Sequence, residues 1–274
     1  MKTINCLILF VLIFFLSNCK NEAKKIQILA EKIDTIRTVS FYNKDVKVTE
    51  FKAKKFGINL EKSGEYNDLL KQIKSDKISL KNLYQNSENK QNIIDSVSNY
   101  LLETLLNKIL PFWYNMPWSM SGYSAIPQVG EVGCSYLVAN TLLQLGFNIN
   151  RFEVGQAASW DICKAFQLED SVIVLKNITQ KEVVSYVKQN LKEGFYTLGL
   201  DCHAGYLLYY HNEVFMVHSS WYYPGVVVIE FADFAPAMQS GITVIGEITT
   251  NEKLIIKWLN DEFVEVRNFR TPEL

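Results

Sequence analysis

Strand-like sequence is concentrated in the last third of the chain, after Gly194. Before that point apolar residues recur at the three- and four-residue spacing of helices. Afterwards, short apolar or alternating runs are separated by turn residues. Five runs are predicted to be strands, at residues 195–200, 203–210, 214–219, 225–231 and 243–248. Helices followed by consecutive antiparallel strands are the order of an α+β fold.

The helical part contains four main predicted elements. Residues 93–109 form an amphipathic pattern that Pro111 is expected to end, and residues 135–145 form another that Gly146 ends. Two further helices are predicted at 156–168 and 179–192, the second with Thr179 as its N-cap. Residues 20–91 look irregular apart from a possible lysine-rich helix at 23–36, and predict a tether, small accessory elements and a polar loop.

The N-terminus has the pattern of an export signal. A positive end is followed by an apolar run from Cys6 to Leu16, which is too short to span a bilayer. Ser17 and Cys19 then resemble a bacterial lipobox, in which Cys19 is lipidated and becomes the new N-terminus. A plain secretory signal or an uncleaved anchor is the alternative. Every one of these interpretations places the rest of the chain outside the cytoplasm, lipid-anchored in the cell envelope if Cys19 is acylated.

We therefore expect three regions: a lipoprotein signal peptide at 1–18, a tether and accessory region at 19–92, and a catalytic domain at 93–274. The chain is 48% hydrophobic and 13% aromatic, enough for a full core. Lysines give residues 20–110 a positive excess, but no basic stripe with interleaved aromatics indicates nucleic-acid binding. Cysteines are too sparse for a disulfide framework. Cys163 and Cys202 are expected to be buried thiols, and a bridge between them is left open.

Cys134 is the candidate nucleophile. It opens the predicted helix at 135–145, and a helix N-terminus lowers the pKa of a thiol. Gly133 leaves the backbone free to approach a substrate, and the first amides of the helix could stabilise an oxyanion. Cys134 is placed three and four residues before Leu137 and Val138, so its side chain should follow the buried face of the helix. The alternative is a small buried hydrophobic residue that begins a core helix.

All three histidines of the chain lie within residues 203–218. If residues 209–212 form a four-residue loop, His203 lies directly opposite His218 on one face of a hairpin. A two-residue turn at 212–213 would instead place them about 13 Å out of register, at about 3.3 Å per residue. Turn geometry decides between these registers. His211 falls in the loop in the first case and should be solvated.

Aromatic residues surround these candidates in the sequence. The stretch at 112–123, which includes Trp118 and Tyr123, predicts either a groove wall or a loop that caps the core. Gln156 could enter the groove, although a polar residue at a helix start is the more ordinary role. Trp221 could line a cleft or belong to the core.

Taken together, these motifs resemble the papain-like cysteine peptidases of the NlpC type, over about residues 110–248. The resemblance is carried by Gly133-Cys134-Ser135, by His203-x-Gly205-Tyr206 and by Val217-His218-Ser219. It implies a papain-like fold in which a helix-borne cysteine packs on an antiparallel sheet that carries the histidines. Trp118 or Tyr123 stands in for the upstream tyrosine of the family, and Gly133 for the acidic residue usual before the cysteine.

The resemblance also implies roles: Cys134 as nucleophile, His203 as general base and acid, and His218 as the residue that orients His203. The implied reaction is amide hydrolysis through a thioester, with no cofactor and no metal. For an envelope lipoprotein, the expected substrate is the stem peptide of peptidoglycan. Three alternatives remain: an acyltransferase or amidase on another substrate, a non-catalytic envelope-binding lipoprotein, and a zinc site formed by Cys134, His203 and His218. The zinc site lacks the usual paired ligand spacing.

Overall fold

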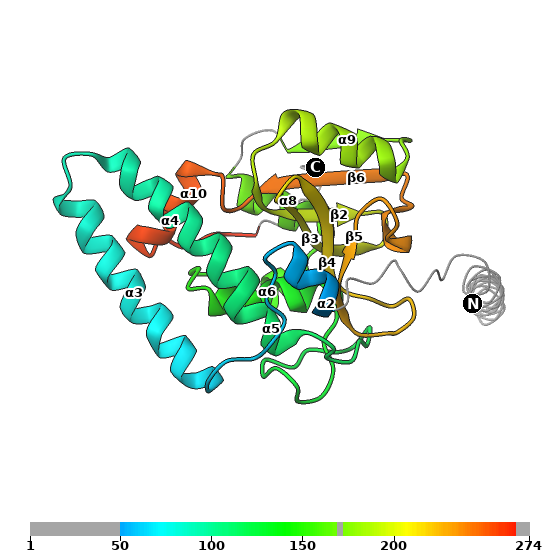
Figure 1. Ribbon diagram of the computed structural model, residues 1–274, viewed down its shortest axis with the longest axis horizontal. Coiled ribbons are helices and arrows are strands. Elements are labelled where there is room, and N and C mark those ends of the chain that lie inside the picture. Colours follow the sequence, from blue (N-terminus) through cyan, green and yellow to red (C-terminus); the bar gives the residue numbers. More distant parts are fainter. Residues whose placement is uncertain (1–49, 169–171, 267–274) are drawn as a thin grey trace, which may run out of the picture. The chain divides into compact units, whose positions relative to one another are not determined.

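The core of the fold is a six-stranded antiparallel sheet (Figure 1), in the order β1-β6-β2-β3-β4-β5. The computed structural model describes residues 50–168 and 172–266. The predicted signal peptide, Cys19 and the possible helix at 23–36 lie outside the described residues. The strands are β1 (Ile173–Lys176), β2 (Gly194–Leu200), β3 (His203–Tyr210), β4 (Glu213–Ser219), β5 (Val227–Phe231) and β6 (Ile242–Glu247).

Most of the helices precede the sheet in the chain. They are α2 (Glu50–Lys55), α3 (Tyr66–Asn86), α4 (Lys90–Thr104), the π-helix η1 (Leu105–Ile109), α5 (Leu110–Trp113), α6 (Cys134–Gln144), α7 (Arg151–Gln156), α8 (Ser159–Gln167), α9 (Gln180–Asn190), the 3₁₀ helix η2 (Pro236–Met238) and α10 (Glu252–Asn260). This combination confirms the predicted α+β class. In the described part of the chain, no helix is long and apolar enough to cross a membrane.

The sheet separates two hydrophobic clusters, because successive side chains of a strand point to opposite faces. One face of β3 presents Ala204, Tyr206 and Leu208 to the larger cluster, which includes residues of α4, η1, α6 and α8. The other face presents Leu207, together with Met216 of β4, to the smaller cluster under α9. Figure 1 shows α9 along one side of the sheet and α6 on the other side.

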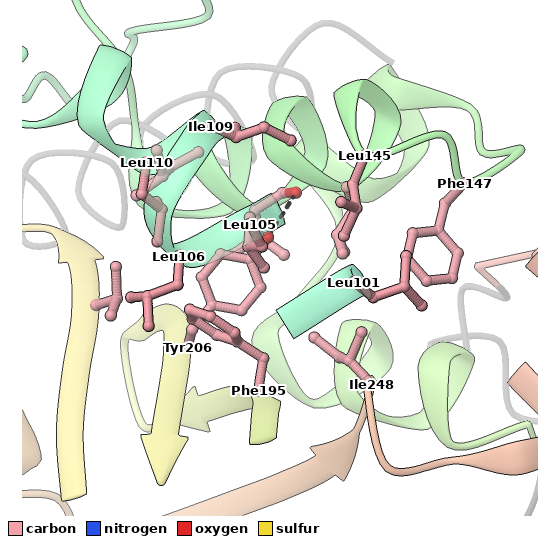
Figure 2. Packing of buried hydrophobic residues seen from close by; sticks show 14 of the residues in the cluster. Leu101, Leu105, Leu106, Ile109, Leu110, Leu145, Phe147, Phe195, Tyr206 and Ile248 are labelled. Carbon is pink, nitrogen blue, oxygen red and sulfur yellow. Dashed lines mark hydrogen bonds between the residues drawn. The ribbon is translucent and has the colours of Figure 1, made fainter. Parts of the chain in front are cut away.

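The larger cluster joins the helices to the sheet through close packing. Figure 2 shows Leu101, Leu105 and Leu106 gathered over the side chains of Phe195 and Tyr206. All five are fully buried. The hydroxyl of Tyr206 donates to the carbonyl of Val138 at 3.1 Å and lies 2.6 Å from Thr141 Oγ1, so α6 is fixed against β3 by polar contacts as well.

The helix predicted at 93–109 extends further than expected. It begins at Lys90, passes through the π-helical turn η1, and continues into α5 across Pro111. The prediction that Pro111 ends the helix is wrong, because Pro111 occupies the first turn of α5. Proline is tolerated there, since the first amides of a helix need no intrahelical acceptor.

Residues 66–86 form the 21-residue helix α3, where the sequence had predicted only small elements and a loop. Only Ile73 of α3 is buried, so its apolar pattern is faint. Partly buried side chains, among them Leu69 and Leu70, pack on the larger hydrophobic cluster. Polar contacts add to this attachment: Tyr66 OH bonds Gln144, and Lys77 Nζ donates to the carbonyl of Gly146 at 2.7 Å. This helix therefore belongs to the same compact unit, residues 45–274, as the rest of the described chain.

The other helices are closer to prediction. Thr179 is the N-cap of α9, as predicted, and forms a capping box with Glu182. The helix predicted at 156–168 is confirmed as α8, but it begins only at Ser159. The preceding helix α7, which ends at Gln156 two extended residues earlier, was not predicted. Strand β1 was not predicted at all.

Two glycines allow α8 to lie directly on the sheet. A Cβ atom on Gly199 would lie 3.0 Å from the carbonyl oxygen of Ser159, and one on Gly246 would lie 2.5 Å from that of Cys163. Backbone atoms cannot move away as a flexible side chain can. The close approach of α8 to β2 and β6 therefore depends on the missing side chains.

We expect Gly246→Ala to lower the free energy of unfolding by about 1–3 kcal/mol, because overpacking forces α8 away from the sheet. Urea denaturation followed by far-UV circular dichroism measures this. Gly241→Ala is the matched control, since its Cβ would meet only Asp201 at an ordinary 3.4 Å. Equal stability of the two variants would show that α8 does not depend on this contact.

Candidate active site

The turn between β3 and β4 sets the position of the histidines. It consists of His211 and Asn212, which have positive φ angles of 48° and 60°. The strands pair Tyr210 with Glu213 and Tyr206 with Val217. Both predicted registers are therefore wrong, and the observed one lies between them. A two-residue turn with two left-handed residues matches the twist of the strands and is favoured over the longer loop.

In this register His218 is opposite Gly205, and His203 is its diagonal neighbour on the same face. Diagonal neighbours are about 7–8 Å apart at the backbone, within reach of long side chains. The rings meet edge to face, with His203 Nε2 2.7 Å from His218 Nδ1. A Cβ on Gly205 would lie 3.0 Å from His218 Cβ, so the glycine leaves room for this contact.

The sequence interpretation missed a third residue that joins these two histidines, Glu230 of β5. We call His203, His218 and Glu230 the polar row. Its Oε1 lies 2.7 Å from His218 Nε2. Strand β5 pairs Val228 with His218 and Glu230 with Met216, so Glu230 is again a diagonal neighbour on the same face. The available signal was a single carboxylate within the apolar run at 226–231. An acid in a buried strand needs a partner.

The side chains of the polar row are shielded from solvent. His218 is fully buried, and His203 and Glu230 are nearly so. Trp221 stacks on His203, with ring centroids 6.3 Å apart and planes within 12°. Burial lowers the pKa of His203 well below its ordinary value, and the nearby ring of His218 lowers it further. His203 is therefore a neutral imidazole at pH 7, the state that a general base requires.

Cys134 is the first residue of α6 and is half-buried against the larger hydrophobic cluster. Within the described chain the only hydrogen-bond contact of its Sγ is a long one, 4.0 Å to Ser135 Oγ. The structure thus brings His203 and His218 together, but it joins neither ring to Cys134. Helix α6 packs on the Tyr206 face of β3, whereas the rings of His203 and His218 extend from the other face.

The segment before Cys134 contacts the end of the sheet at which β3 begins. His203 is the first residue of β3, and the end of β4 is tied to the segment before Cys134. Ser219 Oγ donates to the carbonyl of Val132 at 2.7 Å. Gly133, the N-cap of α6, supplies no side-chain cap, so the first amides of α6 keep the free N–H groups that an oxyanion requires.

Gly133 itself is positioned for packing. Its amide donates to the carbonyl of Gly122 at 2.8 Å. A Cβ there would lie 3.2 Å from that oxygen and 3.3 Å from the carbonyl oxygen of Ser119. The missing side chain of Gly133 thus makes room for the neighbouring loop, and the approach of its backbone to a substrate stays a prediction.

The remaining candidates are dispersed around the start of α6. Trp118 is half-buried and bridges to Val132, whereas Tyr123 is 65% exposed. Ser135 follows the thiol on the first turn. Gln156 ends α7 and does not begin a helix as expected; its amide reaches Tyr136 OH at 3.4 Å.

The other titratable candidates have no link to the row. Cys163 and Cys202 are both free thiols, so the bridge between them is not formed. Cys163 is buried, which raises the pKa of its thiol to about 12. Cys202 is exposed in the β2–β3 turn, so the expectation that it is buried is wrong. His211 is exposed in its turn, as predicted, and stacks on Tyr210.

No group of three or more His, Cys, Asp and Glu side chains in the described ranges is placed to hold a metal ion. The zinc arrangement of Cys134, His203 and His218 is therefore not formed. Comparisons with protein-family models, with curated proteins and with solved structures found no match to this chain.

The depressed pKa of His203 predicts a pH-dependent stability. Below the ordinary histidine pKa of 6.5 the unfolded chain binds a proton that the folded protein does not. Stability contributed by this residue is thus present above pH 6.5 and is lost as the pH falls, by up to about 1.4 kcal/mol per pH unit. Urea unfolding between pH 5 and 8 measures the slope. His203→Gln should flatten it and the control His211→Gln should not; identical slopes for wild type and His203→Gln would contradict the assignment.

Proposed function

We propose that this protein is a cysteine hydrolase with a papain-like site that cleaves amide bonds. The observation that carries the proposal is the 2.7 Å contact between His203 Nε2 and His218 Nδ1. A paired Nε2 leaves Nδ1 as the ring nitrogen available for proton transfer. A buried, neutral imidazole held by a second ring is the arrangement that activates a nucleophile elsewhere in proteins.

In the proposed reaction, His203 Nδ1 takes the thiol proton of Cys134, and the electron pair stays on sulfur. The thiolate attacks the amide carbonyl, and the first amides of α6 stabilise the oxyanion. The tetrahedral intermediate collapses to a thioester, and the amine leaves with the proton from His203. Water, deprotonated by the same ring, then hydrolyses the thioester and restores the thiol.

The reaction requires Cys134 and His203 to meet at the end of the sheet. Cys134 is the first residue of α6 and His203 is the first residue of β3, so each lies at the start of its element. Catalytic hydrogen bonds are often long or poorly aligned before substrate binds. We therefore place the thiol–imidazole contact in the substrate complex.

The proposed substrate follows from the N-terminal sequence. Export and acylation of Cys19 would place the site in the cell envelope, where peptidoglycan is the accessible amide polymer. We propose its stem peptides as substrate; an acyl transfer or amidase reaction on another substrate would use the same residues. The buried row needs no cofactor for either reaction.

A second candidate function is non-catalytic binding in the envelope. It is favoured by the lack of a hydrogen bond between Cys134 and either histidine in the part of the chain that the structure describes. In that case the row of His203, His218 and Glu230 would be a structural polar network. The reactivity of the Cys134 thiol distinguishes the two functions.

We expect the Cys134 thiol of the catalytic form to react with a small electrophile below pH 7, where an ordinary thiol with a pKa of about 8.5 is mostly protonated. His203→Ala should abolish that low-pH reactivity, and Cys134→Ala should abolish peptide release from purified sacculi. The matched control is Cys202→Ala, which removes the exposed thiol of a turn and should change neither result. Mass spectrometry locates the label. Labelling of Cys134 only at alkaline pH, together with intact sacculi, would favour the binding function.

A further inference from the structure

We propose that Glu230 is a positioning residue that fixes the tautomers of both histidines, so that the free Nδ1 of His203 carries the lone pair. The role of this lone pair toward Cys134 rests on the proposed function. The tautomers themselves are argued from the contacts of the three side chains, with Glu230 as a carboxylate and both rings neutral. Glu230, His218 and His203 are connected in series by two hydrogen bonds, each 2.7 Å long.

The Glu230 carboxylate decides which atom donates in each of the two hydrogen bonds. With the Glu230 carboxylate as the acceptor of this bond, the proton lies on His218 Nε2. A neutral imidazole has one N–H, which leaves His218 Nδ1 as an acceptor. Its partner, His203 Nε2, must then donate, and the lone pair of His203 is left on Nδ1. Without Glu230 the same two rings could bond with the opposite polarity, and Nδ1 of His203 would carry the proton.

The sheet fixes the positions of all three groups. They lie on three adjacent strands, each shifted by two residues from its neighbour along a diagonal of one face. The only hydrogen bond that the Glu230 side chain makes to the described residues is the one to His218. The side chain is 10% exposed, so water gives it little compensation. Its place in an apolar strand is accounted for by this one contact.

Glu230 also provides charge that His218 lacks. When His203 takes a proton from the thiol, the S–H bond breaks, an Nδ1–H bond forms and His203 becomes a cation. A neutral His218 accepts from that cation, and the carboxylate behind it is the balancing negative charge in a site where charges are weakly screened. A lone second histidine would orient the first without supplying this charge.

Nitrogen-15 NMR of histidine-labelled protein tests the tautomers directly at about pH 8, where neutral imidazoles prevail. The expected result for the wild type is N–H on Nε2 of both His203 and His218, with exposed His211 as the internal reference. Glu230→Leu should mix the tautomers of both rings. Glu230→Gln, which keeps an acceptor oxygen but no charge, should keep them. The control Glu213→Gln removes an acid of β4 that pairs with Lys188, and should change neither ring.

The rate of Cys134 labelling is the second measurement. Glu230→Leu should slow it about 10- to 100-fold, the effect that loss of a residue orienting a histidine has at metal sites, and Glu230→Gln should fall between Leu and wild type. An Nδ1–H tautomer of His203 in the wild type, or unchanged tautomers in Glu230→Leu, would overturn the proposal; the first result needs no variant to fold. Fixed tautomers in a protein that neither labels at low pH nor cleaves sacculi would support the role of Glu230 on the rings and refute the hydrolase.

Discussion

The two left-handed residues of one tight turn determine how the site is built. His211 and Asn212 close the hairpin with the shortest loop, and this fixes which residues of β3 and β4 are neighbours. One residue of slip would move every side chain of β4 to the other face of the sheet. His218 would then point toward α6, away from His203 and Glu230. The polar row exists because the turn places His218 across from a glycine.

A second constraint separates Cys134 from the two histidines. The helix that carries Cys134 packs on the apolar face of β3, and the histidines occupy the other face. The proposed nucleophile and the proposed base are therefore on opposite faces of the sheet, and they can meet only where the strands end. The polar contacts of Ser219 with Val132 and of Tyr206 with α6 hold that end in place.

Much of the fold could be predicted from the sequence, because it depends on local patterns. The α+β order, α6, five of the strands and the Thr179 cap all follow from periodicity or from a single capping residue. Helix α3 could not be found in this way, since only Ile73 is fully buried and its other apolar side chains are covered only in part. The break between α7 and α8 and the register of the hairpin depend on tertiary packing and on turn conformation.

The candidate site was predictable in part. Clustering of the histidines indicated that His203 and His218 share a place, and they do. Glu230 could not be assigned to them, because its partner is specified by the pairing of β4 with β5, which the sequence does not give. The distance of Cys134 from the rings could not be predicted either, because it depends on how α6 packs on the sheet.

The thiol of Cys163 gives the close contact of α8 with the sheet a further meaning. It lies against Gly199, fully covered and with a pKa raised by burial. A reagent can reach it only in molecules whose α8 has moved off the strands, because the native contact leaves no room. The rate at which Cys163 is modified would therefore measure how often α8 separates from the sheet. The folded protein thus contains its own probe of local unfolding.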